Sequence, residues 1–209
     1  MSSSLRFEIE NFYGNLVAGV DEAGRGPWAG NVVAGAVVFL TQDIDENILN
    51  MLDDSKKMSA KKRELAFNEL YKLQEQNKIA IGVGEASPEE IDAHNILQAT
   101  FMAMSRAVKN MTVKPQFAII DGNQKPKGLE CDCTPVVKGD SKSYSISAAS
   151  IVAKVTRDKQ MSEYALEYPQ YGFEKHAGYG VKQHIEALKE YGITPIHRKS
   201  YKPIKAYLK

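Results

Sequence analysis

The chain has few cysteines, little net charge and no long apolar run. Among its 209 residues are two cysteines and one tryptophan, and the formal net charge is +1. Cys131 and Cys133 form a lone Cys-x-Cys pair, too small a set for a zinc site and too close together for an ordinary structural disulfide. No apolar segment is long enough to span a bilayer, and the first residues lack the apolar core of a signal peptide. We therefore expect a cytoplasmic protein that does not associate with membranes.

The size and charge set two further expectations. A chain of 209 residues with 43% apolar content can bury one good core. We expect one domain over residues 1–209, with the residues from about 165 onward forming a small helical appendage, and a monomer. Because the net charge is close to zero, any nucleic-acid binding must come from a local basic patch.

The apolar patterning predicts an α/β protein. It indicates strands at about 16–22, 31–40, 78–84, 117–120 and 135–137, and helices near 44–53, 59–76, 87–108, 145–168 and 180–191. Ser87-Pro88-Glu89-Glu90 has the residues of a helix start with a capping box. The Ser and Ala residues on one flank of 145–168 favour close packing on a sheet. A hairpin followed by strands that alternate with helices predicts a mixed sheet with helices on both faces.

Two adjacent acids end the first predicted strand. Asp21 and Glu22 are followed by Gly24-Arg25-Gly26-Pro27. Carboxylates at the end of a buried strand are costly unless a cation pairs with them, and divalent ions take carboxylate oxygens. The glycines let the backbone approach a ligand, and the planar guanidinium of Arg25 can bind a phosphate. The motif indicates metal-assisted phosphodiester chemistry.

Other interpretations of this motif exist. Gly24-x-Gly26-x-x-Ala29 matches a dinucleotide-binding fingerprint, with Asp43 or Asp45 near the distance for a ribose contact. That fingerprint must open a helix, whereas a second strand follows here. The P-loop pattern fails because no Gly-Lys-Ser/Thr follows. A tight hairpin with incidental acids is the structural alternative, so other residues must decide.

Further acids follow other predicted strands. Asp121 precedes Gly122 at the end of the fourth strand, and Asp140 follows Gly139 after the fifth. Ligand sites in α/β sheets lie at strand ends, so Asp21, Glu22, Asp121 and Asp140 converge if the first and fourth strands are neighbours. Four carboxylates suit two divalent ions about 4 Å apart, an arrangement that serves in-line displacement at phosphorus. A single strand-end acid is often a turn or cap residue, but three such sites disfavour that explanation.

A series of motifs runs in order through the chain, from about residue 16 to 202. The motifs are Asp21-Glu22-Ala23-Gly24-Arg25-Gly26-Pro27, Asp54-Ser55-Lys56-Lys57, Glu90-Ile91-Asp92, Asn95-Ile96-Leu97, Asp121-Gly122, Val137-Lys138-Gly139-Asp140, 147–158, 168–173 and Thr194-Pro195-Ile196-His197-Arg198. Together they resemble bacterial ribonuclease HII, the type 2 ribonuclease H. The resemblance implies a ribonuclease H-like fold, with a mixed five-stranded sheet flanked by helices. It also implies endonucleolytic cleavage of RNA in RNA–DNA hybrids, and cutting at ribonucleotides in duplex DNA, with Mg²⁺ or Mn²⁺.

The resemblance also implies roles for individual residues. Asp21, Glu22, Asp121 and Asp140 match the family's catalytic, metal-binding acids. Gly24, Arg25 and Gly26 match the loop that grips the backbone around the ribonucleotide 2′-hydroxyl, and Tyr179 matches the tyrosine that stacks on the sugar after the RNA–DNA junction. The family's usual His-Lys-Gly-Tyr reads His176-Ala177-Gly178-Tyr179 here, so a phosphate contact of that lysine is in doubt. The sister type, ribonuclease HIII, lacks this Gly-Arg-Gly form and carries an extra N-terminal domain.

The remaining candidates are less distinctive. Lys56, Lys57, Lys138 and Lys142 lie beside motif acids and are candidates for the phosphate-binding patch, with Lys56 and Lys142 assigned to substrate binding; solvated surface lysines are the alternative. The four histidines have no metal-ligand spacing and are interpreted as structural or surface groups. Trp28 is expected to pack beneath the Gly-Arg-Gly loop, Asp158 to form an ion pair or cap, and Asp54 to lie near the substrate.

We expect two-metal hydrolysis 5′ of a ribonucleotide, leaving a 3′-hydroxyl and a 5′-phosphate. One rival is a hybrid-binding module without catalysis, which would have lost one or more of the four acids. Another is a recombinase-type nuclease on the same fold, which the Gly-Arg-Gly loop and Tyr179 disfavour.

Overall fold

The structure is a computed structural model that describes residues 7–52 and 58–208. Its sheet has five strands in the order β3-β2-β1-β4-β5. β1 pairs antiparallel with β2 and parallel with β4, and β4 pairs parallel with β5. This is the mixed five-stranded sheet that the sequence predicts. The strands are β1 (Val17–Ala23), β2 (Val32–Phe39), β3 (Ile79–Ala86), β4 (Phe117–Asp121) and β5 (Asp132–Val136).

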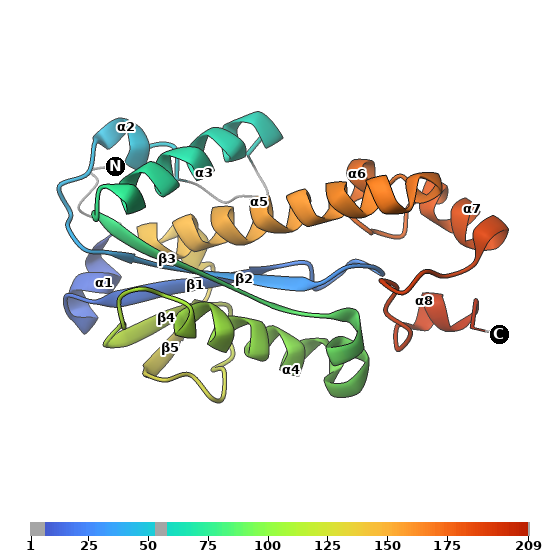
Figure 1. The fold of residues 1–209 in the computed structure, drawn as a ribbon. Helices are drawn as coiled ribbons and strands as arrows, with labels where there is room; N and C mark the ends of the chain where they lie inside the picture. The colour runs from blue at the N-terminus through green and yellow to red at the C-terminus, as the bar shows by residue number, and fades with distance from the viewer. Residues whose placement is uncertain (1–6, 53–57, 209) are drawn as a thin grey trace.

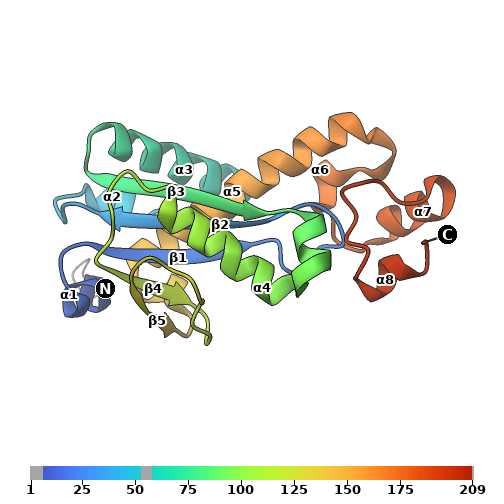
Figure 2. The same ribbon diagram turned by 60° about the horizontal axis from the view of Figure 1, so that its bottom comes forward.

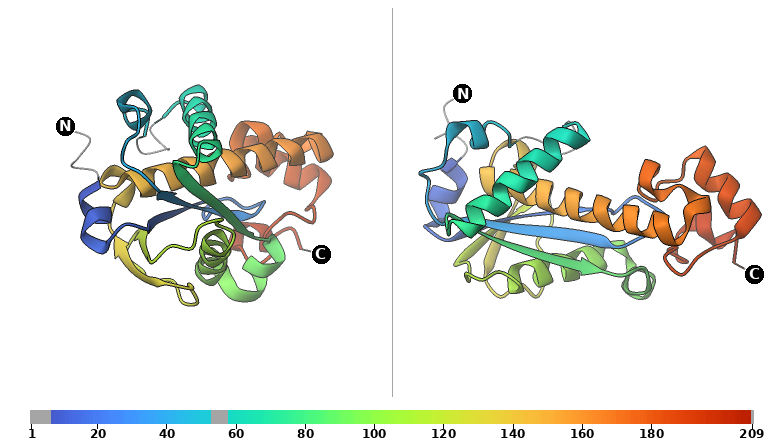
Figure 3. Two further views of the ribbon diagram at one scale, coloured as in Figure 1. Left: turned by 60° about the vertical axis from the view of Figure 1, so that its left-hand side comes forward. Right: turned by 45° about the horizontal axis from the view of Figure 1, so that its top comes forward.

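Two long helices pack on opposite faces of this sheet. Figure 1 shows α5 and α3 on one side and α4 on the other, and the turned view in Figure 2 brings the α4 face forward. The short helices α6, α7 and α8 lie beyond one end of the sheet, as Figure 1 and the right panel of Figure 3 show. The helices are α1 (Glu8–Tyr13), α2 (Glu46–Leu49), α3 (Ala60–Glu75), α4 (Pro88–Lys109), α5 (Tyr144–Glu167), α6 (Phe173–His176), α7 (Lys182–Tyr191) and α8 (Lys202–Lys205).

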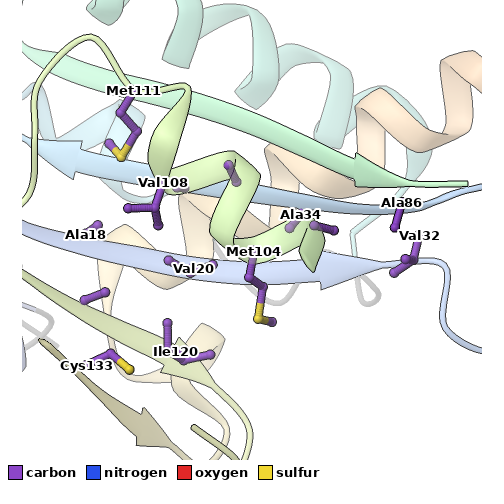
Figure 4. Close-up of a cluster of buried hydrophobic side chains, with 14 of the residues drawn as sticks. Ala18, Val20, Val32, Ala34, Ala86, Met104, Val108, Met111, Ile120 and Cys133 are labelled. Atoms are coloured by element: carbon purple, nitrogen blue, oxygen red, sulfur yellow. The ribbon is translucent and has the colours of Figure 1, made fainter. Parts of the chain in front are cut away.

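The face of the sheet toward α4 carries a continuous apolar core. Even-numbered strand residues such as Val20 and Ile120 point into it and meet Met104 and Val108 of α4 (Figure 4). Alternation along the strands follows from the two-residue period of β structure, so the odd-numbered residues of β1 and β4 face α5 instead. The start of α4 has the predicted capping box between Ser87 and Glu90.

Close contact between α5 and β1 depends on a glycine. A Cβ on Gly19 would lie 2.1 Å from the backbone carbon of Ser145. The buried Ser and Ala residues of α5 allow the same approach from the helix side, as the sequence predicts. This contact matters for the site, because Asp21 lies two residues after Gly19 on the same face.

Several short elements differ from the expectation. The helix predicted at 44–53 is a single turn, and α1, α6 and α8 had no prediction. β5 begins at Asp132, before its predicted start, and Asn95 kinks α4 with a φ of 65°. One-turn elements bury too few residues to leave a clear period. None of the helices in the described ranges is both long enough and apolar enough to cross a membrane.

Gly19→Ala should lower the free energy of unfolding by at least about 3 kcal/mol, because the new Cβ overlaps the α5 backbone, which cannot move aside as a side chain can. Gly26→Ala is the control, since its Cβ would meet only the Tyr179 ring, at 3.3 Å. Denaturant unfolding of the two variants tests this. Equal stabilities would show that α5 does not require the close approach at β1.

Candidate active site

The carboxyl ends of β1 and β4 bring two acids to one edge of the sheet. Val20 pairs with Ile120 in the parallel register, so Asp21 and Asp121 follow at the same level. Both are odd-numbered and share the α5 face. Asp21 is only 3% exposed, and its Oδ1 accepts a hydrogen bond from the Glu22 N–H at 2.7 Å. The predicted neighbourhood of the first and fourth strands is therefore confirmed.

The Asp21 carboxyl is held in an unfavourable environment for its charge. Burial, and then the negative charges of Glu22 and Asp121, raise its pKa well above the usual value. Hydrogen bonds from the Ser150 side chain and the Glu22 backbone act in the opposite direction and do not cancel the effect. Three acids are thus close enough to repel one another at a desolvated strand end.

Asp140 approaches this group through the turn that follows β5. Gly139 donates its N–H to Asp121 Oδ1 at 2.7 Å, and Lys138 before it takes a left-handed conformation. Asp140 is the next residue, in the 3₁₀ turn Gly139–Ser141. The structure therefore brings all four predicted acids to the same end of the sheet.

These acids are an electrostatic cluster, but they do not form a complete ligand set. Within residues 7–52 and 58–208, no three side chains of His, Cys, Asp or Glu are arranged to hold a single metal ion as they stand. Hard carboxylate oxygens in mutual repulsion are nevertheless the donor chemistry that a divalent cation stabilises. The chemistry of these donor groups therefore suits a divalent ion, although their present arrangement is not a ligand set for one.

A cleft of about 430 Å³ opens beside the acids. It is lined by Glu22, Ala23, Gly24, Arg25, Gly26, Arg63, Lys154, Arg157 and Tyr179. Arg25 Nη1 lies 3.3 Å from Glu22 Oε1, so the expected phosphate-binding arginine faces one of the predicted acids. Tyr179 lies against Gly26, and 49% of the residue is exposed. The Gly-Arg-Gly loop and Tyr179, distant in sequence, therefore share one wall of the cleft.

Lys154 and Arg63 are cleft residues that were not assigned from the sequence. Lys154 Nζ lies 2.7 Å from Asp158 Oδ1, and Arg63 Nη2 lies 3.8 Å from Asp158 Oδ2. The ion pair expected for Asp158 is thus present, with Lys154 as its partner at 2.7 Å. Lys154 lies within the 147–158 motif, so the sequence could have identified it as a site residue. Arg63 lies on a polar helix outside the motifs, and nothing in the sequence distinguishes it from other surface residues.

Arg198 holds the loop 24–31 from beneath. Its guanidinium is fully buried and donates to the five backbone carbonyl oxygens of Gly24, Arg25, Pro27, Gly30 and Asn31 at 2.6–3.2 Å. The Tyr201 hydroxyl, which accepts from Arg198, donates in turn to the Arg25 carbonyl at 2.7 Å. A residue near the C-terminal end thus fixes the backbone of the predicted substrate loop.

Arg157 of α5 supports the same loop from a second side. It donates to the carbonyl oxygens of Ala29, Asn31 and Ala177 at 3.0–3.1 Å. Burial lowers its pKa to about 10, and the positive charge of Arg198 adds to this effect. A Cβ on Gly24, where φ is +97°, would lie 2.1 Å from Arg157 Nε. Only glycine therefore fits at the first position of the Gly-Arg-Gly loop.

The other predicted residues have mixed outcomes. Lys142 is exposed after the 3₁₀ turn, two residues from Asp140, and is not among the residues that line the described cleft. Lys56, with Asp54 and Lys57, lies outside the described residues. The Trp28 ring packs against Gly180, and its backbone bonds to Gly178 and Arg198, so the expectation of a packing role is confirmed.

Comparison with known proteins identifies the family. A family model described as ribonuclease HII matches residues 18–204. The chain belongs to the ribonuclease HII family. The ribonuclease HII of Marinomonas sp. (strain MWYL1) is 50% identical over 94% of this chain and 95% of its own. That of Endomicrobium trichonymphae is 52% identical over 93% and 90%. The crystal structure of ribonuclease H2 from Pyrococcus horikoshii OT3 has a TM-score of 0.77 at 30% identity, covering 91% and 96% of the two chains.

This assignment fixes the general activity. Membership of the ribonuclease HII family makes the chain a nuclease of the hydrolase class with a ribonuclease H-like fold. It supports ribonuclease H endonuclease activity on RNA–DNA hybrids. The predicted family and fold are thus confirmed.

Asp21→Asn should raise the melting temperature of the metal-free protein, because the amide carries no charge for Glu22 and Asp121 to repel. The gain should be larger at pH 8 than at pH 5. The raised pKa of Asp21 means that its folded-state carboxyl takes up a proton as the pH falls, so the wild type loses its electrostatic cost in acid. Thermal melts in a chelator at both pH values test this, with Asp132→Asn on exposed β5 as the control. A melting temperature at pH 8 no higher than that of the wild type would contradict the repulsion.

Proposed function

We propose that this ribonuclease HII cleaves the RNA strand of RNA–DNA hybrids and also cuts 5′ of ribonucleotides embedded in duplex DNA, giving 3′-hydroxyl and 5′-phosphate ends. One observation carries the proposal: Glu22, the Gly-Arg-Gly loop and Tyr179 line one cleft, and the charge of Glu22 acts on the buried Asp21 beside it. A nuclease that reads a single ribonucleotide needs hydrolytic groups and 2′-hydroxyl recognition within one nucleotide of each other.

Asp21, Glu22, Asp121 and Asp140 would hold the metal ions of this site. Mg²⁺ and Mn²⁺ both accept carboxylate oxygens, and four acids suit a two-metal arrangement. Bound there, such ions would activate water and neutralise charge at the scissile phosphate. The repulsion of the buried Asp21 by Glu22 and Asp121 supports this assignment, because a bound cation would relieve it.

The residues of the cleft would orient the nucleic acid. Gly24 and Gly26 present backbone to the ribose without side-chain bulk, and the partly exposed guanidinium of Arg25 can reach a phosphate. The Tyr179 ring offers a flat apolar face for the next sugar. Lys154 and Arg63 also line the cleft, and the two cations share the single carboxylate of Asp158. With Arg25 they would form the local basic patch that a chain of net charge +1 needs to bind a polyanion.

We also propose that the protein is cytoplasmic and monomeric, and that it forms one domain whose helical appendage starts near residue 165. Lys56 and Lys142 also stay candidates for phosphate contact. The rival without catalysis, a hybrid-binding module, is disfavoured because all four acids are present.

Asp121→Asn should reduce cleavage by about 100-fold or more, because a neutral amide replaces a charged metal ligand. The protein should stay folded, with a melting temperature no lower than that of the wild type because the repulsion of Asp21 is relieved, and its binding of an RNA–DNA hybrid should change little. Turnover, hybrid affinity and thermal stability should be measured together, with Asp132→Asn as the control. Near-normal turnover would remove Asp121 from the catalytic set.

Tyr179→Ala should cost more activity on a duplex with one ribonucleotide than on a uniform hybrid. A ring packed on the following sugar leaves little room for a second 2′-hydroxyl. The contact is therefore favourable only at the junction, where a deoxyribose follows the ribonucleotide. Tyr179→Phe should cost less because the ring is retained. Cutting rates of the three proteins on both substrates give the test, and equal losses on the two substrates for Tyr179→Ala would show that the tyrosine does not read the junction.

A further inference from the structure

Two histidines that the catalytic proposal does not use form a buried pair behind Tyr179. His184 of α7 and His197 are both fully buried, and their Nε2 atoms lie 2.9 Å apart. His184 Nδ1 lies 3.0 Å from the Tyr179 carbonyl oxygen. On the other side, the Thr194 N–H donates to His197 Nδ1 at 2.9 Å. The four residues Thr194, His197, His184 and Tyr179 form a continuous chain of hydrogen bonds, here called the histidine relay.

The first bond of the relay determines the direction of the others. Because His197 Nδ1 accepts from a backbone N–H, its ring proton must be on Nε2. That proton is donated to His184 Nε2, so His184 carries its own proton on Nδ1 and donates it to the Tyr179 carbonyl. Each neutral histidine has a single tautomer that satisfies both neighbours. A second proton on either ring would place two N–H groups face to face.

The surroundings keep both rings neutral. Burial lowers the pKa values of His184 and His197 to about 4. His176 stacks on His184 with ring centroids 5.1 Å apart, and the rings of Tyr171 and Phe173 contact both histidines of the pair. At neutral pH the relay therefore has its full set of hydrogen bonds.

The same short segment also anchors the substrate loop. His197 bridges to Ala29 in an isolated β-pair, and the next residue, Arg198, binds the carbonyl groups of the loop 24–31. His197 is thus hydrogen-bonded to Tyr179 through His184. The next residue, Arg198, donates directly to the carbonyl groups of Gly24 and Arg25. Two consecutive residues fix both sides of one cleft wall relative to each other.

We propose that His184 and His197 are positioning residues for ribonucleotide recognition: through the relay they hold the backbone of Tyr179 in register with the Gly-Arg-Gly loop. The role rests on the proposed reading of the junction by Tyr179. It extends that proposal from the tyrosine ring to two buried side chains that do not themselves touch the substrate.

Two substitutions at one position separate the relay from simple packing. In His184→Asn the side-chain amide replaces Nδ1 and can still donate to the Tyr179 carbonyl, but the His197 Nε2–H loses its acceptor. In His184→Gln the amide reaches the place of Nε2 and can still accept from His197, but the bond to Tyr179 is lost. The readout is the ratio of cutting rates on a single-ribonucleotide duplex and on a uniform hybrid, measured for the wild type, both variants and Tyr179→Ala.

We expect the ratio to fall about fivefold in His184→Gln, which loses the direct bond to Tyr179, toward the value of Tyr179→Ala; fivefold corresponds to one hydrogen bond of about 1 kcal/mol. In His184→Asn, which keeps that bond and loses only the support of His197, the ratio should fall by about twofold. The melting temperature verifies that each variant is folded. The fluorescence emission of Trp28 reports on the local packing, because the ring centroids of Trp28 and His184 are 5.7 Å apart. Equal ratios in the two variants, while Tyr179→Ala lowers the ratio, would overturn the relay.

The tautomers of the two histidines can be measured directly in the wild type, so the relay can be tested even if the variants do not fold. Nitrogen-15 NMR of the imidazoles should show the Nδ1–H tautomer for His184 and the Nε2–H tautomer for His197 at pH 7. Any other pair of tautomers contradicts the relay, even if a variant fails to fold. If Tyr179→Ala leaves the ratio unchanged, the junction-reading function fails and with it the role of the histidines in recognition, while the tautomers still decide whether the relay exists.

Discussion

The buried guanidinium of Arg198 is the interaction on which the site depends most. Taking this charge out of water is unfavourable, and the cost is offset by hydrogen bonds to five backbone carbonyl groups of the loop 24–31. Arg157 adds bonds to Ala29, Asn31 and Ala177. Because backbone groups supply the acceptors, the two arginines fix the path of the chain and leave the Gly-Arg-Gly side of the loop open to the cleft. A loop held in this way loses little conformational entropy when it binds a ligand.

The acid cluster depends on a different constraint, the tight packing of α5 on β1. Gly19 lets the helix approach, and Asp21 is buried two residues later on the same face. The adjacent ends of β1 and β4 then bring Asp121 close enough to repel it. The site therefore combines a loop stabilised by buried positive charge with a strand edge destabilised by buried negative charge. The repulsion at the strand edge favours the binding of a cation, and the loop held by the arginines positions the substrate beside it.

The sequence predicted the features that depend on local pattern. Acids at strand ends, the capping box at Ser87 and the small-residue flank of α5 all follow from short-range spacing, and the structure has each of them. The roles of Arg157 and Arg198 could not be predicted in this way, because the carbonyl groups of the loop 24–31 that they bind lie more than a hundred positions away in the chain. His184 and His197 showed no ligand spacing because their partner atoms are backbone groups and each other. Lys142, chosen for its proximity to Asp140 in sequence, is exposed and does not line the described cleft, so its phosphate contact stays a prediction.

The buried arginines hold the loop 24–31 rigid before substrate binds. Amide hydrogen exchange of the substrate-free protein tests this most directly. The Trp28 and Gly30 amides donate to the Gly178 and Ile196 carbonyl groups at 2.8 and 2.9 Å, so both should exchange slowly in the wild type. Arg198→Lys keeps the charge but loses the planar set of donors. It should accelerate exchange at both amides by about tenfold or more, while the amides of β2 keep their wild-type rates. Unchanged exchange at Trp28 and Gly30 in a folded Arg198→Lys protein would contradict the account.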